Sequence, residues 1–209
     1  MKIASKLYSL AELVKESPDW HFNIPIYQRL YVWGEDQVLT LLNDLVNAYE
    51  RREDLFFLGG TLLVEQEGSN GRHFDLIDGQ QRFTTLWLIS HAWREALKPF
   101  LTVTTDKFTE PRLRFAIRPE VNRFLETLAL GDRGQPMPDE EATKRMRTAL
   151  DLMKSVFEKR PLPAGVSDQV AHLAGLTEFV FGKVKFVITT VPRETDLNKL
   201  FEVINRWTY

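Results

Sequence analysis

An apolar strand that runs directly into an apolar helix constrains the fold of this chain most strongly. In "DLIDGQQRFTTLWLIS" (75–90), the apolar pair Leu76 and Ile77 is followed by an acid, a glycine, two amides and an arginine at positions 78–82. A segment that is apolar nearly all round then follows, with no proline to interrupt it. A helix of that kind is buried. We therefore predict a buried strand, a tight junction and a buried helix over residues 79–97.

The segments before this junction favour strands and short helices. The stretches "FFLGGTLLVEQ" (56–66) and "HFDLI" (73–77) flank a turn-like "EGSNGR" and predict a β-hairpin. "HFNIPIYQRLYVW" (21–33) is expected to be extended, because its proline disfavours a preceding helix and its β-branched and aromatic residues favour a strand. Apolar spacing predicts helices over 9–17 and 35–52.

The second half of the chain has a mostly helical pattern. Spacing and breakers predict a short strand at 112–117, helices at 119–130, 140–159, 167–181 and 195–205, and a strand at 183–191. We therefore expect an α+β fold in two parts, a core over residues 1–105 and a mainly helical part over 106–209 that packs on it.

Composition narrows the class of protein. Of the 209 residues, 44% are hydrophobic, which is enough to bury a core and argues against a disordered chain. There is no cysteine, so disulfides, zinc–thiolate sites and cysteine catalysis are excluded. The net charge of −2 excludes a histone-like basic protein but allows a local basic groove. We see neither a signal-peptide core nor an apolar stretch of about 18 residues, so we expect a soluble cytoplasmic protein with no membrane partner.

The polar junction has the chemistry of an anion site. A helix N-terminus presents free N–H groups and the positive end of the helix dipole, and Gly79 lets a ligand approach the backbone closely. Arg82 is mildly unfavourable in a first helical turn unless it binds an anion such as phosphate. Asp78 is a candidate Mg²⁺ ligand or water-orienting group, and Gln80 or Gln81 is suited to position a nucleophile.

A purely structural explanation stays open for the same residues. Asp78 and Gln81 have the spacing of a capping box, which satisfies backbone N–H groups at a helix start. Arg82 could simply pair with an acid. Two glutamines beside an arginine exceed what a cap needs, which keeps a binding site under consideration. The segment is not a P-loop, because it lacks the glycine spacing and the Gly-Lys-Ser/Thr ending.

The stretch "IPIYQRLYVW" (24–33) holds a second unusual set of side chains. In strict strand alternation Tyr27, Arg29 and Tyr31 share one face. Such a set can stack on a base or bind a phosphate. The alternative is a sheet whose aromatic residues belong to the core and whose arginine covers them.

Two further sets of residues invite a functional interpretation. In "EPRLRFAIRPE" (110–120), Arg112 and Arg114 alternate onto one strand face and could follow a phosphate backbone or protect a sheet edge. The four histidines are scattered without metal-ligand spacing, so structural or surface roles are expected for them.

The motifs, taken together and in order, resemble those of a known family. "IPIYQRLYVW", "FFLGGTLLVEQ" and "DLIDGQQRFTTL" are similar to the N-terminal domain of GmrSD-type, modification-dependent restriction endonucleases, within the ParB/sulfiredoxin-like fold group. The family pattern is Ile-Pro-x-Tyr-Gln-Arg-x-Tyr-x-Trp, a Phe-x-Gly-Gly/Thr strand, and Asp-Gly-Gln-Gln-Arg-x-Thr-Thr. A later family helix, Phe-x-x-x-Asn before an Arg-Gly loop, has a counterpart in "LFEVIN" (200–205). The resemblance implies a ParB/sulfiredoxin-like mixed β-sheet with flanking helices.

The resemblance also implies that the domain binds and hydrolyses a nucleoside triphosphate, with Mg²⁺ as the expected cofactor, and senses or cuts modified phage DNA. The implied catalytic residues are Asp78, which is also the candidate Mg²⁺ ligand, Gln81 and Arg82. The implied nucleotide-binding residues are Gly79, Gln80, Arg82, Thr84, Thr85, Tyr27, Gln28 and Arg29. The implied DNA-binding residues are Tyr27, Gln28, Arg29 and Tyr31.

The end of the given sequence differs from the family pattern. After Asn205 the sequence reads "RWTY", without the family's glycine-containing loop, its following helices or a His-Asn-His nuclease domain. Two alternatives to an NTPase with endonuclease activity therefore stay open. One is a regulatory module that binds nucleotide or DNA without hydrolysis, and the other is a subunit, single or oligomeric, that recruits a nuclease partner.

Overall fold

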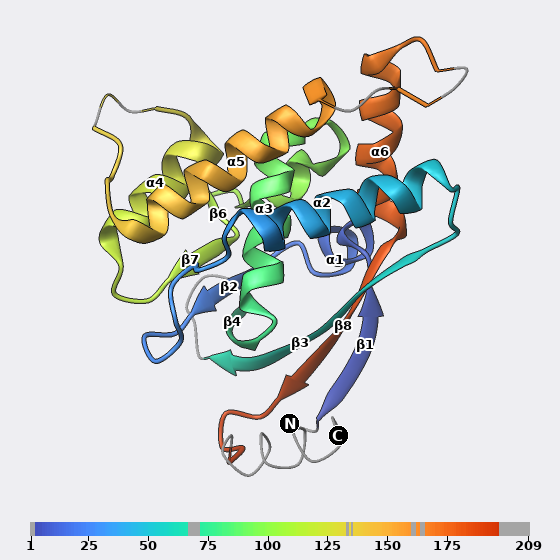
Figure 1. The fold of residues 1–209 in the computed structure, drawn as a ribbon. Coiled ribbons are helices and arrows are strands. Elements are labelled where there is room, and N and C mark those ends of the chain that lie inside the picture. Colours follow the sequence, from blue (N-terminus) through green and yellow to red (C-terminus); the bar gives the residue numbers. More distant parts are fainter. Residues whose placement is uncertain are drawn as a thin grey trace.

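A mixed six-stranded sheet organises the computed structural model of this chain (Figure 1), which describes residues 3–66, 72–132, 134, 136–159, 162–163 and 166–196. The strand order is β1-β8-β3-β4-β2-β7, and the strands are β1 (Ala4–Tyr8), β2 (Trp20–Ile24), β3 (Phe56–Gln66), β4 (Arg72–Asp78), β7 (Leu113–Phe115) and β8 (Val184–Val191). Pairs β1·β8 and β3·β4 are antiparallel, whereas β8·β3, β4·β2 and β2·β7 are parallel. The predicted α+β class and the β3–β4 hairpin are confirmed.

Helices cover one side of this sheet (Figure 1). They are α1 (Leu10–Glu16), α2 (Glu35–Glu50), α3 (Gln80–Trp93), the 3₁₀ helix η1 (Glu95–Phe100), α4 (Pro119–Leu130), α5 (Glu141–Lys159) and α6 (Gln169–Lys183). The strands β5 (Thr102–Thr104) and β6 (Thr109–Pro111) form a separate two-stranded ladder. Among the described residues, no helix is long and apolar enough to cross a membrane.

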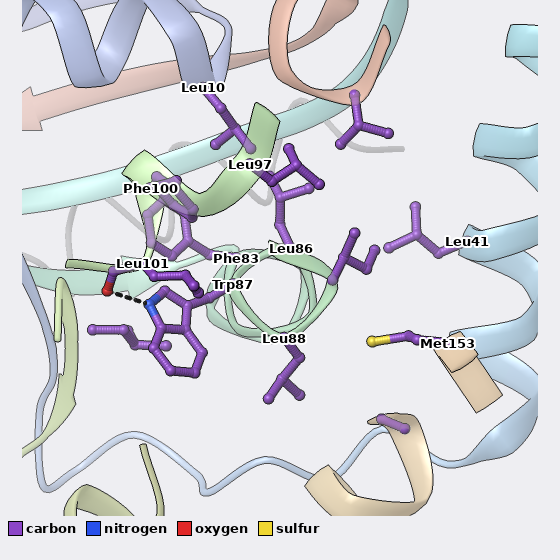
Figure 2. Close-up of a cluster of buried hydrophobic side chains, with 14 of the residues drawn as sticks. Leu10, Leu41, Phe83, Leu86, Trp87, Leu88, Leu97, Phe100, Leu101 and Met153 are labelled. Atoms are coloured by element: carbon purple, nitrogen blue, oxygen red, sulfur yellow. Dashed lines mark hydrogen bonds between the residues drawn. The ribbon is translucent and has the colours of Figure 1, made fainter. Parts of the chain in front are cut away.

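Helix α3 lies at the centre of the core, as its apolar sequence predicts. Figure 2 views it end-on, with Phe83, Trp87 and Leu88 pointing in different directions into surrounding side chains. The indole nitrogen of the fully buried Trp87 donates a hydrogen bond to the Leu101 carbonyl at 3.1 Å. The helix ends at Trp93 rather than at the predicted residue 97. Because α3 is held in the core, the polar residues 78–82 at its N-terminus have a fixed position beside the sheet.

Two differences from the predicted elements matter for the site. The extended segment predicted over 21–33 is wrong beyond Ile24, because the chain turns at Pro25, whose carbonyl accepts a hydrogen bond from the Gln28 amide at 2.9 Å. The alternation of side chains predicted for 24–33 therefore does not exist. Strand β1 was not predicted, because four of its five residues are exposed and show no alternation; it pairs with β8 at the sheet edge.

The C-terminal prediction has no structural test. The helix expected over 195–205 and its "LFEVIN" motif fall almost wholly on residues 197–209, which lie outside the described residues.

Candidate functional site

Glycine conformations shape the junction between β4 and α3. Gly79 is the N-cap of α3 and has a φ of +81°, in the left-handed region that favours glycine. A Cβ atom at Gly79 would lie 2.8 Å from the Gly60 carbonyl oxygen of β3, which is closer than real contacts allow. The junction therefore needs glycine both for its conformation and for its close approach to β3.

The capping box predicted for Asp78 and Gln81 is wrong. No side chain in the described part of the chain caps α3, and the Gln81 side chain is directed elsewhere. Its Oε1 accepts a hydrogen bond from the Val32 amide at 2.9 Å, and its Nε2 donates one to the Leu30 carbonyl at 3.0 Å. Gln81 thus gives the backbone of residues 30–32 the hydrogen bonds that a neighbouring strand would have supplied.

Three further hydrogen bonds hold the 25–33 loop in place, two to the β4–α3 junction and one to α5. Gln28 Nε2 donates to the Ile77 carbonyl at 2.8 Å, at the end of β4. The Tyr31 hydroxyl and Thr85 Oγ1 lie 2.9 Å apart, and an Arg145 guanidinium nitrogen from α5 donates to the Val32 carbonyl at 3.3 Å. The two sequence motifs, about fifty residues apart, are therefore in direct contact.

Several predicted site residues are buried in this contact. Tyr31 is only 1% exposed, and burial raises the pKa of its hydroxyl to about 12. Thr84 and Thr85 are buried as well, and Thr85 Oγ1 donates to the Gln81 carbonyl at 2.8 Å. These positions do not fit the predicted contacts of Tyr31 with DNA or of the two threonines with nucleotide. We assign all three a structural role.

The remaining motif residues line one cavity of about 220 Å³. Its lining comes from the 25–33 loop, the end of β4 and the first turn of α3, and comprises Gln28, Arg29, Trp33, Ile77, Asp78, Gly79, Gln80, Gln81 and Arg82. Tyr27, which is 63% exposed, is not part of this lining. Burial and the Asp75 carboxylate raise the pKa of the Tyr27 hydroxyl. The cavity unites the predicted phosphate site with two residues of the second motif and adds Trp33, which was not predicted.

Arg82 lies along the glycine pair of β3. One of its terminal nitrogens donates to the Gly60 carbonyl at 3.0 Å, and a Cβ atom at Gly59 would lie 3.4 Å from the guanidinium. The Gly59-Gly60 pair was predicted only as a break in a buried strand. A glycine pair in a strand interior indicates the close approach of another group. Here that group is the Arg82 guanidinium, which packs against Gly59 and Gly60.

Gln80 and Gln81 have opposite environments although both are buried, at 6% and 7% exposure. Within the described structure, Gln80 Oε1 is a buried acceptor with no hydrogen-bond partner. A buried unpaired polar atom costs about 1–3 kcal/mol, and such an atom in a native structure indicates a functional site or a missing water or ion. Gln80 lines the cavity, but this oxygen has almost no accessible surface, so its side chain would have to turn to present it to a ligand there.

The charges of the cavity suit an anion. Arg29 is exposed and forms no ion pair with any described carboxylate, and Arg82 is the second guanidinium in the lining. The first-turn N–H groups of α3 add the positive end of its dipole. Asp78 is the single carboxylate. Two guanidiniums with helix N–H groups are suited to bind an anion such as phosphate.

The donor set fits one kind of metal binding. The described residues contain no group of three or more His, Cys, Asp or Glu side chains that could hold a metal ion. A site made only of protein ligands is therefore not supported. Mg²⁺ often binds through one carboxylate together with substrate phosphate oxygens, and Asp78 in this cavity fits that arrangement.

Comparison with protein families gives a match over residues 10–207 to the N-terminal domain of the GmrSD restriction endonucleases. The chain belongs to this family. The match includes both motifs that line the cavity, and the family places the chain among DNA-directed restriction and defence proteins. Comparison with curated proteins found no similar sequence.

In this GmrSD-family domain, Arg112 and Arg114 of the stretch over 110–120 bind other parts of the protein. Arg112 is fully buried, and burial lowers its pKa to about 10. Its guanidinium donates to four backbone carbonyls at 3.0–3.3 Å, those of Ser17, Pro18, Trp20 and Thr102. Arg114 pairs with Glu110 at 2.8 Å and with Glu126 at 3.6 Å. The alternative of a phosphate-tracking face at Arg112 and Arg114 is therefore wrong.

Proposed function

We propose that this domain binds a nucleoside triphosphate and hydrolyses it, with the phosphates in the cavity between the 25–33 loop and α3. One observation supports this most: Arg29, Arg82 and the first residues of α3 line one cavity. The two guanidiniums would bind phosphate oxygens through paired hydrogen bonds.

In this proposal each cavity residue has a separate task. Arg29 and Arg82 stabilise the negative charge on the phosphates, and Asp78 would hold a nucleotide-bound Mg²⁺ that neutralises further charge. Gln80 Oε1, once its side chain turns toward the cavity, would accept a hydrogen bond from the attacking water, so the role predicted for Gln81 passes to Gln80. Water attacks the terminal phosphorus and gives its proton to an oxygen of that phosphate, the bridging P–O bond breaks, and the nucleoside diphosphate leaves with the electron pair. Gln81 positions the loop that holds Arg29.

DNA would contact the exposed surface beside the cavity. Tyr27 and Arg29 are exposed neighbours on the 25–33 loop, where an aromatic ring and a guanidinium can bind a base and a phosphate. The loop is bonded to the junction through Gln28 and Gln81. A nucleotide bound at the junction can therefore alter the loop that faces DNA. Cleavage of the DNA would be done by a nuclease domain or partner subunit.

A second candidate function has one observation in its favour. Gln81 is fully engaged in holding the loop, and Asp78 is the single carboxylate in the cavity lining. With so few groups able to activate water, the domain could bind nucleotide as a switch without hydrolysing it.

Phosphate release from ATP, GTP, CTP and UTP with Mg²⁺, with and without DNA, separates these functions. We expect turnover by the native domain and its loss in Arg82→Ala, whereas Arg114→Ala is the matched control arginine. Thermal stabilisation by nucleotide without turnover would favour the switch, since a ligand that binds only the folded state raises stability. Neither turnover nor stabilisation with any of the four nucleotides would overturn the proposal.

A further inference from the structure

A second and larger cavity, of about 390 Å³, adjoins the proposed phosphate site. It lies between one face of α2 and the start of β3, and neither motif alone predicts it. Trp33 and Arg82 line both cavities, so the two lie next to each other with these side chains between them. Small-molecule sites usually measure about 300–1,000 Å³. The phosphate cavity alone is below that range, whereas the two cavities together fall within it.

The α2 wall of the second cavity presents acceptors. Asp36, Thr40 and Asp44 are spaced four residues apart, so they lie on one helix face, and the two carboxylates are separated by about 12 Å along the axis. The Thr40 hydroxyl is engaged, because it donates to the Asp36 carbonyl at 2.7 Å. No ion pair between described residues involves Asp36 or Asp44. This wall therefore offers two carboxylates to hydrogen-bond donors.

The opposite wall presents aromatic surface. Phe57 lines the cavity and is 57% exposed, which is unusual for a large apolar side chain near a folded core. The Trp33 ring lies in the lining where the cavity meets the phosphate site. Flat aromatic surfaces of this kind stack with nucleobases.

We propose that the second cavity binds the nucleoside part of the nucleotide whose phosphates occupy the first, which rests on the proposed function. The distribution of charge matches the polarity of that ligand. The phosphates bind in the first cavity, which Arg29 and Arg82 line, and Arg82 lines the second cavity as well. The base packs against Phe57 and Trp33, while Asp36 and Asp44 accept hydrogen bonds from ribose hydroxyls and from the N–H groups of the base.

Calorimetric titrations that compare nucleoside triphosphates with inorganic tripolyphosphate, both with Mg²⁺, test this assignment. We expect the native domain to bind nucleoside triphosphates at least about tenfold more tightly than tripolyphosphate. Phe57→Ala and Asp44→Asn should each weaken nucleoside triphosphate binding about fivefold or more and leave tripolyphosphate binding unchanged. Arg82→Ala should weaken both ligands. Leu55→Ala, an exposed apolar neighbour outside the lining, is the control and should change neither.

The outcomes separate this inference from the proposed function. If Phe57→Ala and Asp44→Asn leave nucleoside triphosphate binding unchanged, or weaken both ligands equally, the nucleoside does not occupy this cavity, while the phosphate site stands. If the native domain binds neither ligand, the proposed function fails and this inference fails with it.

Discussion

The sequence suggests phosphate binding at two arginines, Arg82 and Arg112, but the structure gives the two side chains different environments. Around Arg112 both terminal nitrogens of the guanidinium are engaged, with four backbone carbonyls at 3.0–3.3 Å in a buried site, and only Nε has no partner in the described structure. Around Arg82 the one hydrogen-bond partner in the described structure is the Gly60 carbonyl, and the side chain lines both proposed ligand cavities and a third, smaller one. Nearby, Gln80 has a buried acceptor without a partner in the described structure.

This difference identifies binding groups more reliably than residue type does. A polar side chain whose hydrogen bonds are all made inside the protein holds the fold together, whereas one left incomplete beside a cavity is available to a ligand. By this criterion Gln81 and Tyr31 are structural. Arg112 is structural as well, because both of its terminal nitrogens donate to backbone carbonyls and its unpaired Nε lies outside the lining of the junction cavity. Arg82 and Gln80 are candidates for binding.

The largest effect on stability should come from removing the buried guanidinium of Arg112. Arg112→Met keeps most of the apolar stem but leaves four carbonyls without their donor, so we expect a loss of roughly 3–5 kcal/mol in the free energy of unfolding. Urea denaturation measures it. Arg82→Ala, measured in the same way, should cost less than about 1 kcal/mol. Similar losses for the two variants would remove the distinction between these regions.

His21 gives a second, pH-dependent effect, because its ring is buried without a hydrogen bond, with Nδ1 3.6 Å from a Glu110 carboxylate oxygen, and it is not part of the lining of the two cavities discussed above. Its ring stacks on His73 at 4.7 Å, and burial, helped by His73, Arg112 and Arg114, lowers its pKa to about 4. The unfolded chain binds this proton near pH 6.5, so stability is full above that pH and falls as pH drops toward 4.

We expect the His21 contribution to be about 2 kcal/mol between pH 7 and pH 5. Urea denaturation of the native domain and of His21→Asn at both pH values measures it as the difference between their pH-induced losses. His91, whose pKa burial also lowers to about 4, titrates in both proteins and cancels in the difference. Equal losses in both proteins would show that folding does not lower the pKa of His21, so that its ring takes up the proton equally in the folded and unfolded states.

The adjacent glutamines give the smallest and most specific contrast. Gln81→Leu removes both bonds to the 25–33 loop, so we expect a loss of about 1–2 kcal/mol in stability together with weaker nucleotide binding. Gln80→Leu removes a buried acceptor that has no partner, so stability should be unchanged or higher while turnover falls. Denaturation curves and phosphate release on the same samples report both quantities. A less stable Gln80→Leu would show that this oxygen is satisfied in solution.

Much of the fold could be predicted from sequence because it depends on local patterns. Apolar spacing located the helix over 119–130, which the structure has as Pro119–Leu130, and turn residues located the β3–β4 hairpin. The edge strand β1 was missed because its partner, β8, lies about 180 residues away and its exposed residues do not alternate. The strand predicted over 21–33 includes Pro25, although this proline begins the turn that takes the chain out of the sheet and into the 25–33 loop.

The site was only partly predictable for the same reason. The sequence shows which residues are polar at the junction, but not which partners they find. Gln81 bonds residues 30 and 32, and Tyr31 bonds Thr85, across separations of 49–54 positions. Gln81, predicted as catalytic, Tyr31, predicted to bind DNA, and Thr85, predicted to bind nucleotide, instead hold the loop through these contacts. The second cavity depends on α2 and β3 meeting in space, which no local pattern reveals.

The central claim is that the β4–α3 cavity binds phosphate through Arg82. Calorimetric titration of tripolyphosphate with Mg²⁺ into the native domain, Arg82→Ala and Arg114→Ala tests it most directly. We predict that Arg82→Ala binds at least about tenfold more weakly, because a charge-assisted hydrogen bond contributes about 1.5–3 kcal/mol. Arg114→Ala should match the native domain. Unchanged binding in a folded Arg82→Ala variant would contradict the account.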